Sequence, residues 1–194
     1  MTRDGSTNDQ PAITPGLDGC QVCRQLRLEG PDDRTFAVAP ASGGGWSNVS
    51  TALLRLFQRI GSQPTQAVII EQPELTDRYV QALIGHGIAH AEASSNVYLM
   101  EGSRLSSEQE ELLFALGWLA PTADEDDPDE MPANWYLPQI HGDWPYLVEM
   151  LVATMVGIFG FDERHVVSVR TFAAENPCKA CSWDDEDSKP DACE

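Results

Sequence analysis

Apolar residues recur at helical spacing in three parts of the sequence. In the first, between Val49 and Ile60, they fall at positions i, i+3, i+4 and i+7, which is typical of a helix with one buried face. We expect Ser47 to cap the start of this helix and Gly61 to end it. The predicted stripe is Val49, Ala52, Leu53, Leu56, Phe57 and Ile60.

A second helix is expected to begin with a capping box, formed either by Ser106 with Gln109 or by Ser107 with Glu110. The helix should end at Gly117. Its apolar positions are Leu112, Leu113 and Leu116.

A third helix should begin near Asp143 and end at Gly160. Pro145 falls in its first turn, where the missing N–H does no harm. Its apolar stripe is Leu147, Met150, Leu151, Thr154, Met155 and Ile158.

Strands are expected between and after these helices. Ala67–Glu71 is a short apolar run, and Arg78–Ile84 and Ile88–Ala93 flank Gly85-His86-Gly87, which is typical of a hairpin turn. We expect Ser94–Leu99 to extend the second arm past a bend. Val166–Phe172 is rich in β-branched residues and predicts a last strand.

The order of elements is helix, three-stranded meander, two helices, strand. This order predicts the α+β class, a small antiparallel sheet (the meander plus the C-terminal strand) with about three helices packed on it. Upstream, Leu26, Leu28, Phe36 and Val38 flank a Gly-Pro-Asp-Asp turn that can join two short strands.

Composition divides the chain into four parts. Residues 1–19 predict a flexible leader, and residues 20–45 an extension whose fold the pattern leaves open. The α+β domain should span residues 46–174. Residues 175–194 form an acidic C-terminal tail.

The 194-residue chain carries 31 acidic and 12 basic residues, a net charge of −19. Such a surface repels phosphate backbones and anionic lipid headgroups, which argues against nucleic-acid and membrane partners. No apolar run approaches the ~20 residues that cross a bilayer. The start of the chain has no apolar segment after Arg3, so we expect no signal peptide and a cytoplasmic protein.

Two CxxC pairs, Cys20/Cys23 and Cys178/Cys181, lie near opposite ends of the sequence. Four thiolates are a set that zinc prefers, so one structural zinc is one interpretation, and it requires the two termini to meet. Redox chemistry is a second, although neither pair has the setting that lowers a thiol pKa. The third is that these cysteines have no function.

No pattern for catalysis is found. The sequence lacks GxSxG and SxxK nucleophile motifs, and no phosphate-binding loop follows its glycine run. The acidic run at residues 124–130 lacks the spacing of a calcium loop. We therefore expect no enzyme activity and no cofactor other than the zinc.

Aromatic residues gather around the acidic, proline-rich connection between the last two helices. Such residues either close the edge of a core or line a binding surface, and the pattern leaves both open. The candidate partner-binding residues are Trp118, Trp135, Tyr136 and Trp144.

Three groups of short segments resemble one family. They are Tyr79-Val80-Gln81 with residues 91–99, then residues 105–109 and 116–118 with Pro121 and Asn134-Trp135, and last residues 156–160. Over residues 46–172 the chain resembles the TY-Chap family, actinobacterial domains that are similar to type III secretion chaperones.

The resemblance implies a small α+β chaperone or adaptor without catalytic residues, which holds a client protein and is expected to form a homodimer. An acidic surface favours a client segment that is basic or apolar. The CxxC pairs lie outside the family pattern. They leave a zinc- or redox-responsive regulator as the alternative.

Overall fold

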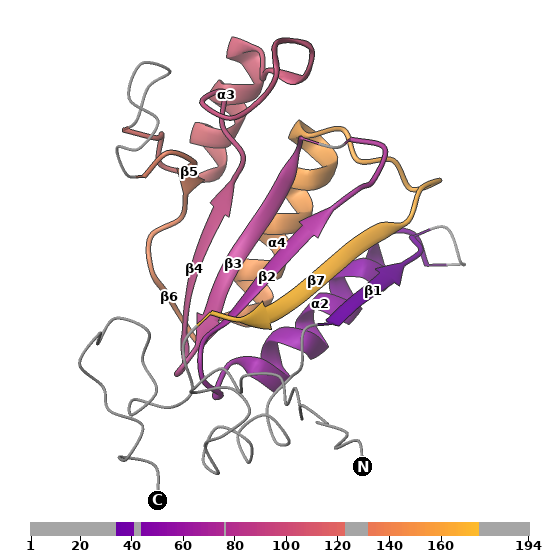
Figure 1. The fold of residues 1–194 in the computed structure, drawn as a ribbon, viewed down its shortest axis with the longest axis vertical. Coiled ribbons are helices and arrows are strands. Elements are labelled where there is room, and N and C mark those ends of the chain that lie inside the picture. The colour runs from indigo at the N-terminus through magenta and orange to yellow at the C-terminus, as the bar shows by residue number, and fades with distance from the viewer. Residues whose placement is uncertain (1–33, 41–43, 76, 123–131, 175–194) are drawn as a thin grey trace, which may run out of the picture. The chain divides into compact units, whose positions relative to one another are not determined.

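The computed structural model describes residues 34–40, 44–75, 77–122 and 132–174 (Figure 1). Within these residues the strands are β1 (Arg34–Val38), β2 (Gln66–Glu71), β3 (Tyr79–Gly85), β4 (Ile88–Ala93), β5 (Trp135–Tyr136), β6 (Ile140–His141) and β7 (Val167–Ala173). The α-helices are α2 (Trp46–Ile60), α3 (Ser107–Leu116) and α4 (Trp144–Ala153). A short 3₁₀ turn, η1 (Glu101–Ser103), precedes α3, and a π turn, η2 (Thr154–Ile158), follows α4.

All strand pairs of the described sheet are antiparallel, in the order β1-β7-β2-β3-β4-β5, with β6 also beside β4. The predicted α+β class and the β2–β4 meander are confirmed. The C-terminal strand lies between β1 and β2, where Val169 pairs with Phe36 on one side and Ile70 on the other. Strands β5 and β6 are additions that the sequence pattern does not predict.

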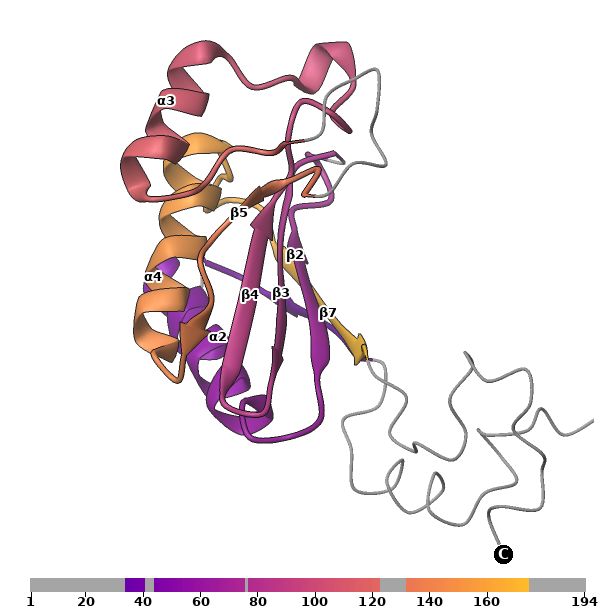
Figure 2. The ribbon, with the colours of Figure 1, turned by 90° about the vertical axis from the view of Figure 1, so that its left-hand side faces the viewer.

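The three described helices lie on one side of the sheet (Figure 2). The hydrophobic core is formed by residues of these helices and of the strands. Alternate residues of each strand point toward the helices. Val68, Val80, Ala89 and Val167 are fully buried there. On the opposite face of the sheet, which no described helix covers, the Leu83 side chain remains 45% exposed.

Helix ends follow the local chemistry, with one correction. Helix α3 begins with the capping box of Ser106 and Gln109, and Gly117 ends it with a φ of 101°. Helix α4 starts at Asp143, whose side chain accepts a hydrogen bond from the Tyr146 N–H. The prediction that Ser47 caps α2 is wrong. Gly45 is the N-cap, and the Ser47 hydroxyl donates to the Gly44 carbonyl instead.

Helix α4 runs directly into the π turn η2. The predicted stripe of Leu147, Met150, Leu151, Thr154, Met155 and Ile158 is buried throughout. The Thr154 hydroxyl donates to the Met150 carbonyl at 2.9 Å. Gly160, with a φ of 74°, ends the segment as predicted.

The meander contains one correct and one wrong turn prediction. His86 and Gly87 form the β3–β4 turn with φ values of 53° and 81°. The expected extension of β4 through residues 94–99 is wrong, because Ser95 uses its hydroxyl to accept from the Val97 N–H and to donate to the Ala133 carbonyl. These local side-chain hydrogen bonds replace the backbone hydrogen bonds to a neighbouring strand that an extension of β4 would need.

The predicted hairpin upstream falls partly on the described residues. Its second arm is β1, which pairs with β7. Its first arm, with Leu26 and Leu28, lies outside the described residues.

Candidate functional site

Two apolar hollows meet along the face of α4 that points away from the sheet. The first, of about 470 Å³, lies between α2 and α4, and the second, of about 480 Å³, lies between α3, the start of α2 and η2. Val152 and Ala153 line both. We call the combined surface the α4 groove. It is lined by Trp46, Ser50, Thr51, Leu54, Leu112, Leu116, Pro145, Val148, Glu149, Val152, Ala153, Val156, Gly157 and Ile158.

The α4 groove exists because α4 and η2 are apolar on more than their core-facing side. Val148 and Val152 follow one another at i, i+4 and both line the groove, Val152 partly exposed and Val148 5% exposed at the edge of the core, whereas Leu147 and Leu151 are fully buried. A helix with one neighbouring layer normally carries polar residues on its other side. An apolar second face is the pattern of a helix that contacts a further partner.

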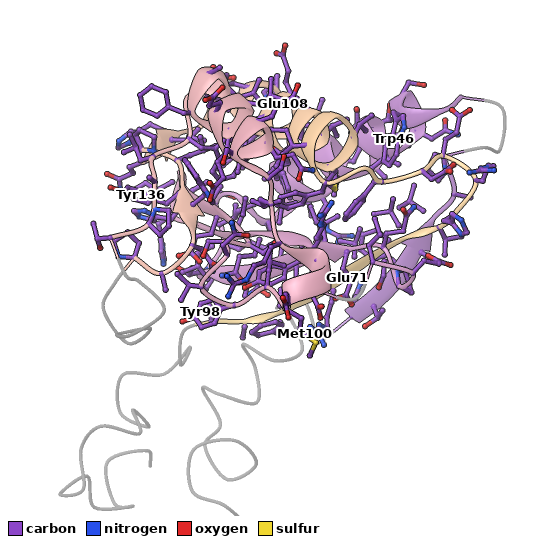
Figure 3. All side chains as sticks on the ribbon, turned by 90° about the horizontal axis from the view of Figure 1, so that it is seen from above. Trp46, Glu71, Tyr98, Met100, Glu108 and Tyr136 are labelled. Carbon is purple, nitrogen blue, oxygen red and sulfur yellow. The ribbon has the colours of Figure 1, made fainter. Side chains whose placement is uncertain are left out.

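Large apolar side chains of the groove remain accessible to solvent. Leu112 on α3 is 45% exposed and Val156 on η2 is 36% exposed. Figure 3 shows Trp46 and Glu108 on the helix side of the fold, with Tyr98 and Met100 toward the sheet side. Contiguous exposed apolar surface of this kind marks binding sites in soluble proteins.

One carboxylate lines the groove. Glu149 is part of its lining and is exposed, and Glu108 and Glu111 are exposed on α3. The groove therefore combines an apolar floor with negative charge beside it.

The aromatic residues proposed as partner-binding have different positions. Trp118 is fully buried, and its Nε1 donates to the Thr154 hydroxyl at 2.9 Å, so it is a core residue and not an exposed contact. Trp135 is also buried, with 6% exposure. Tyr136 and Trp144 are partly exposed but belong to different elements, β5 and α4, and do not line the α4 groove.

Sequence reasoning missed the groove residues because it took each stripe as one buried face. A signal was present in Val148, Val152 and Val156, which repeat every four residues beside the core stripe. Leu112 is one of three apolar positions expected in its helix, but of α3 only Leu113 is fully buried.

Polar residues on the other sheet face fasten β5 to the meander. The Glu92 carboxylate accepts hydrogen bonds from Gln81 at 2.7 Å and from Asn134 at 3.0 Å. The Asn134 amide also donates to the Tyr79 hydroxyl at 3.3 Å. Burial raises the pKa of Tyr79, the Asn134 hydrogen bond opposes that rise, and the Glu92 charge adds to it. Because the Glu92 carboxylate accepts from both Gln81 on β3 and Asn134 beside β5, this cluster has a structural role in holding β5 against the meander.

The described residues hold no group of three or more His, Cys, Asp or Glu side chains placed to bind a metal ion. Cys20, Cys23, Cys178 and Cys181 lie outside the described residues, so the zinc site stays a prediction. None of the helices in the described part of the chain is long and apolar enough to span a bilayer.

The family model described as T3SS (YopN, CesT) and YbjN peptide-binding chaperone 3 matches residues 39–173. This chain belongs to the TY-Chap family. Neither the curated proteins nor the solved structures gave a significant match. The TY-Chap match includes α2, α3 and α4, which build the groove, and extends to the end of β7.

Proposed function

We propose that this chain is a non-enzymatic peptide-binding chaperone or adaptor that holds an amphipathic segment of a client protein in the α4 groove. The family match supports the peptide-binding role. The observation that carries the choice of site is the continuity of the two apolar hollows along the exposed face of α4.

A helical client segment suits a groove bounded by helices. Such segments place apolar residues at i, i+3, i+4 and i+7 into an apolar groove. Two helices, α2 and α3, form the walls, and α4 with η2 forms the floor. Burial of client side chains against Leu112, Val152 and Val156 would remove exposed apolar surface from both proteins, which favours association.

The charge of the chain favours a client segment with basic residues beside its apolar face. Glu149 lines the groove, and the whole chain carries a net charge of −19. Opposite charges raise the association rate and help to select the partner, and both effects weaken as salt is added.

The experiment is a binding titration with a defined probe. A labelled synthetic peptide would carry leucines at helical spacing and lysines at the other positions, and fluorescence anisotropy would give its Kd for the full chain. A shuffled peptide of the same composition has no apolar face and should bind much more weakly.

Two matched variants locate the site. Leu112 and Leu83 are each 45% exposed, but Leu112 lines the groove and Leu83 lies on the opposite sheet face. Leu112→Asp should weaken binding about tenfold or more, because a charge replaces buried apolar contact. Leu83→Asp should change the Kd by no more than about twofold. Equal effects of the two variants would place the client elsewhere.

The zinc- or redox-responsive alternative, the cytoplasmic location and the homodimer remain predictions from the sequence. Metal analysis of the purified chain and of a Cys20→Ser variant would test the first. Sedimentation would test the dimer.

A further inference from the structure

A further hollow lies on the other side of α2, between that helix and the strands β1 and β7. Figure 1 shows where these three elements lie in the fold. Its volume is about 730 Å³. Its walls share no residue with the α4 groove, because α2 turns Ser50 and Leu54 to one and Arg55 and Arg59 to the other. We call it the arginine groove.

Three guanidinium groups line the arginine groove, and none of the lining residues in the described part of the chain carries a carboxylate. They belong to Arg34 on β1 and to Arg55 and Arg59 on α2. Arg55 and Arg59 are four residues apart, so their like charges face each other on one side of the helix. The concentration of positive charge is unexpected in a chain of net charge −19.

Other arginines of the described fold make hydrogen bonds or ion pairs within the chain. Arg78 donates to the carbonyls of Ser103 and Phe159, and Arg164 pairs with Asp162. Arg55 and Arg59 have no ion pair with any residue that the structure describes, and both are exposed. The described fold therefore gives them no partner that would explain their position.

Between the guanidiniums the lining is partly apolar, with Thr35 and Thr171 as its other polar members. Phe36 and Leu56 contribute to the lining, together with Ala52. A guanidinium binds a carboxylate through two parallel hydrogen bonds, whereas neighbouring apolar residues offer nothing to an isolated inorganic anion. The combination suits a chain segment that alternates carboxylates with apolar side chains.

We propose that the arginine groove binds an acidic segment of a partner protein, whose carboxylates pair with Arg55 and Arg59 while its apolar residues contact Phe36 and Leu56. Charge complementarity selects this occupant. Carboxylates elsewhere on the chain repel a bound polyanion only where it passes within about a Debye length of them, roughly 8 Å at physiological salt. A short acidic peptide can stay within the arginine groove. A nucleic acid, with a charge on every phosphate, would extend past the groove toward those carboxylates and be repelled by them.

The test uses the full chain and a labelled synthetic peptide of alternating Glu and Val. Fluorescence anisotropy at low salt would give the Kd, and a peptide with Gln in place of Glu is its matched control. Arg55→Gln and Arg59→Gln should each weaken binding about tenfold, because each removes a charge-assisted pair. Arg170→Gln makes the same charge change on the opposite face of β7 and should leave the Kd within about twofold.

Three results would overturn the proposal. They are no binding of the Glu–Val peptide, equal binding of the Gln–Val peptide, and equal weakening by Arg59→Gln and Arg170→Gln. Tighter binding of a single-stranded DNA of similar length would replace the acidic peptide with a nucleic acid. Because Arg55 and Arg59 do not line the α4 groove, their variants should leave the leucine–lysine peptide bound. Failure here would not affect the proposed function.

Discussion

The indole of Trp118 donates its hydrogen bond to the hydroxyl oxygen of Thr154, and both side chains are fully buried. The same hydroxyl donates to the Met150 carbonyl at 2.9 Å. Trp118 follows α3, and Thr154 is the residue at which α4 becomes η2. One hydroxyl therefore joins the segment after α3, which is one wall of the α4 groove, to the groove floor, and the hydroxyl both accepts and donates a hydrogen bond.

Replacing Thr154 by Val should destabilise the fold by about 1–3 kcal/mol, because the buried Trp118 N–H would lose its acceptor. Val has nearly the same shape as Thr, so the change removes the hydroxyl and little else. Urea unfolding followed by tryptophan fluorescence would measure the change. Thr154→Ser keeps the hydroxyl and serves as the control. If the Val variant is no less stable than the Ser variant, the hydrogen bond is not important for stability.

Gly61 should not tolerate a side chain. A Cβ at this position would lie 2.4 Å from Trp144 Cζ2 and 2.8 Å from the Phe57 carbonyl oxygen. Gly61→Ala should cost about 1–3 kcal/mol, since the tryptophan ring must move within a packed contact. Gly102→Ala is the control, because no other atom lies within 4 Å of its added Cβ. Thermal unfolding of both variants would test this, and equal Tm values would contradict it.

Arg164 should set the titration of Asp162. Hydrogen bonds from the Arg164 side chain, and then from its backbone N–H, hold the pKa of Asp162 well below its usual range. A lowered folded pKa means that the pair's contribution to stability is complete above the unfolded value of about 3.9 and is lost as the pH falls below it. In an NMR titration, Arg164→Gln should raise the pKa of Asp162, whereas Arg170→Gln should leave it unchanged. No rise with Arg164→Gln would contradict the assignment.

Elements with a complete local signal could be predicted from the sequence. The start of α3 and the β3–β4 turn at His86 are examples, because neighbouring residues alone decide them. The sequence left two capping boxes open at that start, and the structure has the one formed by Ser106 and Gln109. The sheet position of β7 could not be predicted, since pairing between distant strands leaves no local pattern. Strand β5 is too short to show alternation.

The candidate site was less predictable than the fold. Aromatic residues beside an acidic loop left a core edge and a binding surface both open, and Trp118 lies in the core, where its indole donates to Thr154. The α4 groove is built from three helices far apart in sequence. Periodicity identifies the residues of one helix that share a face, such as Val148 and Val152, but not which other helices lie beside that face.

The placement of β7 has a consequence for synthesis of the chain. Among the described strands, β7 comes last, yet it lies between β1 and β2 and pairs with both. A nascent chain that ends before Val167 has the β2–β4 meander and α2, but β1 has no described strand to pair with. Contacts between such distant segments form slowly because a long loop must close first. The sheet must therefore be completed late, so each new copy exposes unfinished edges at β1 and β2 until β7 has been made and has paired with both.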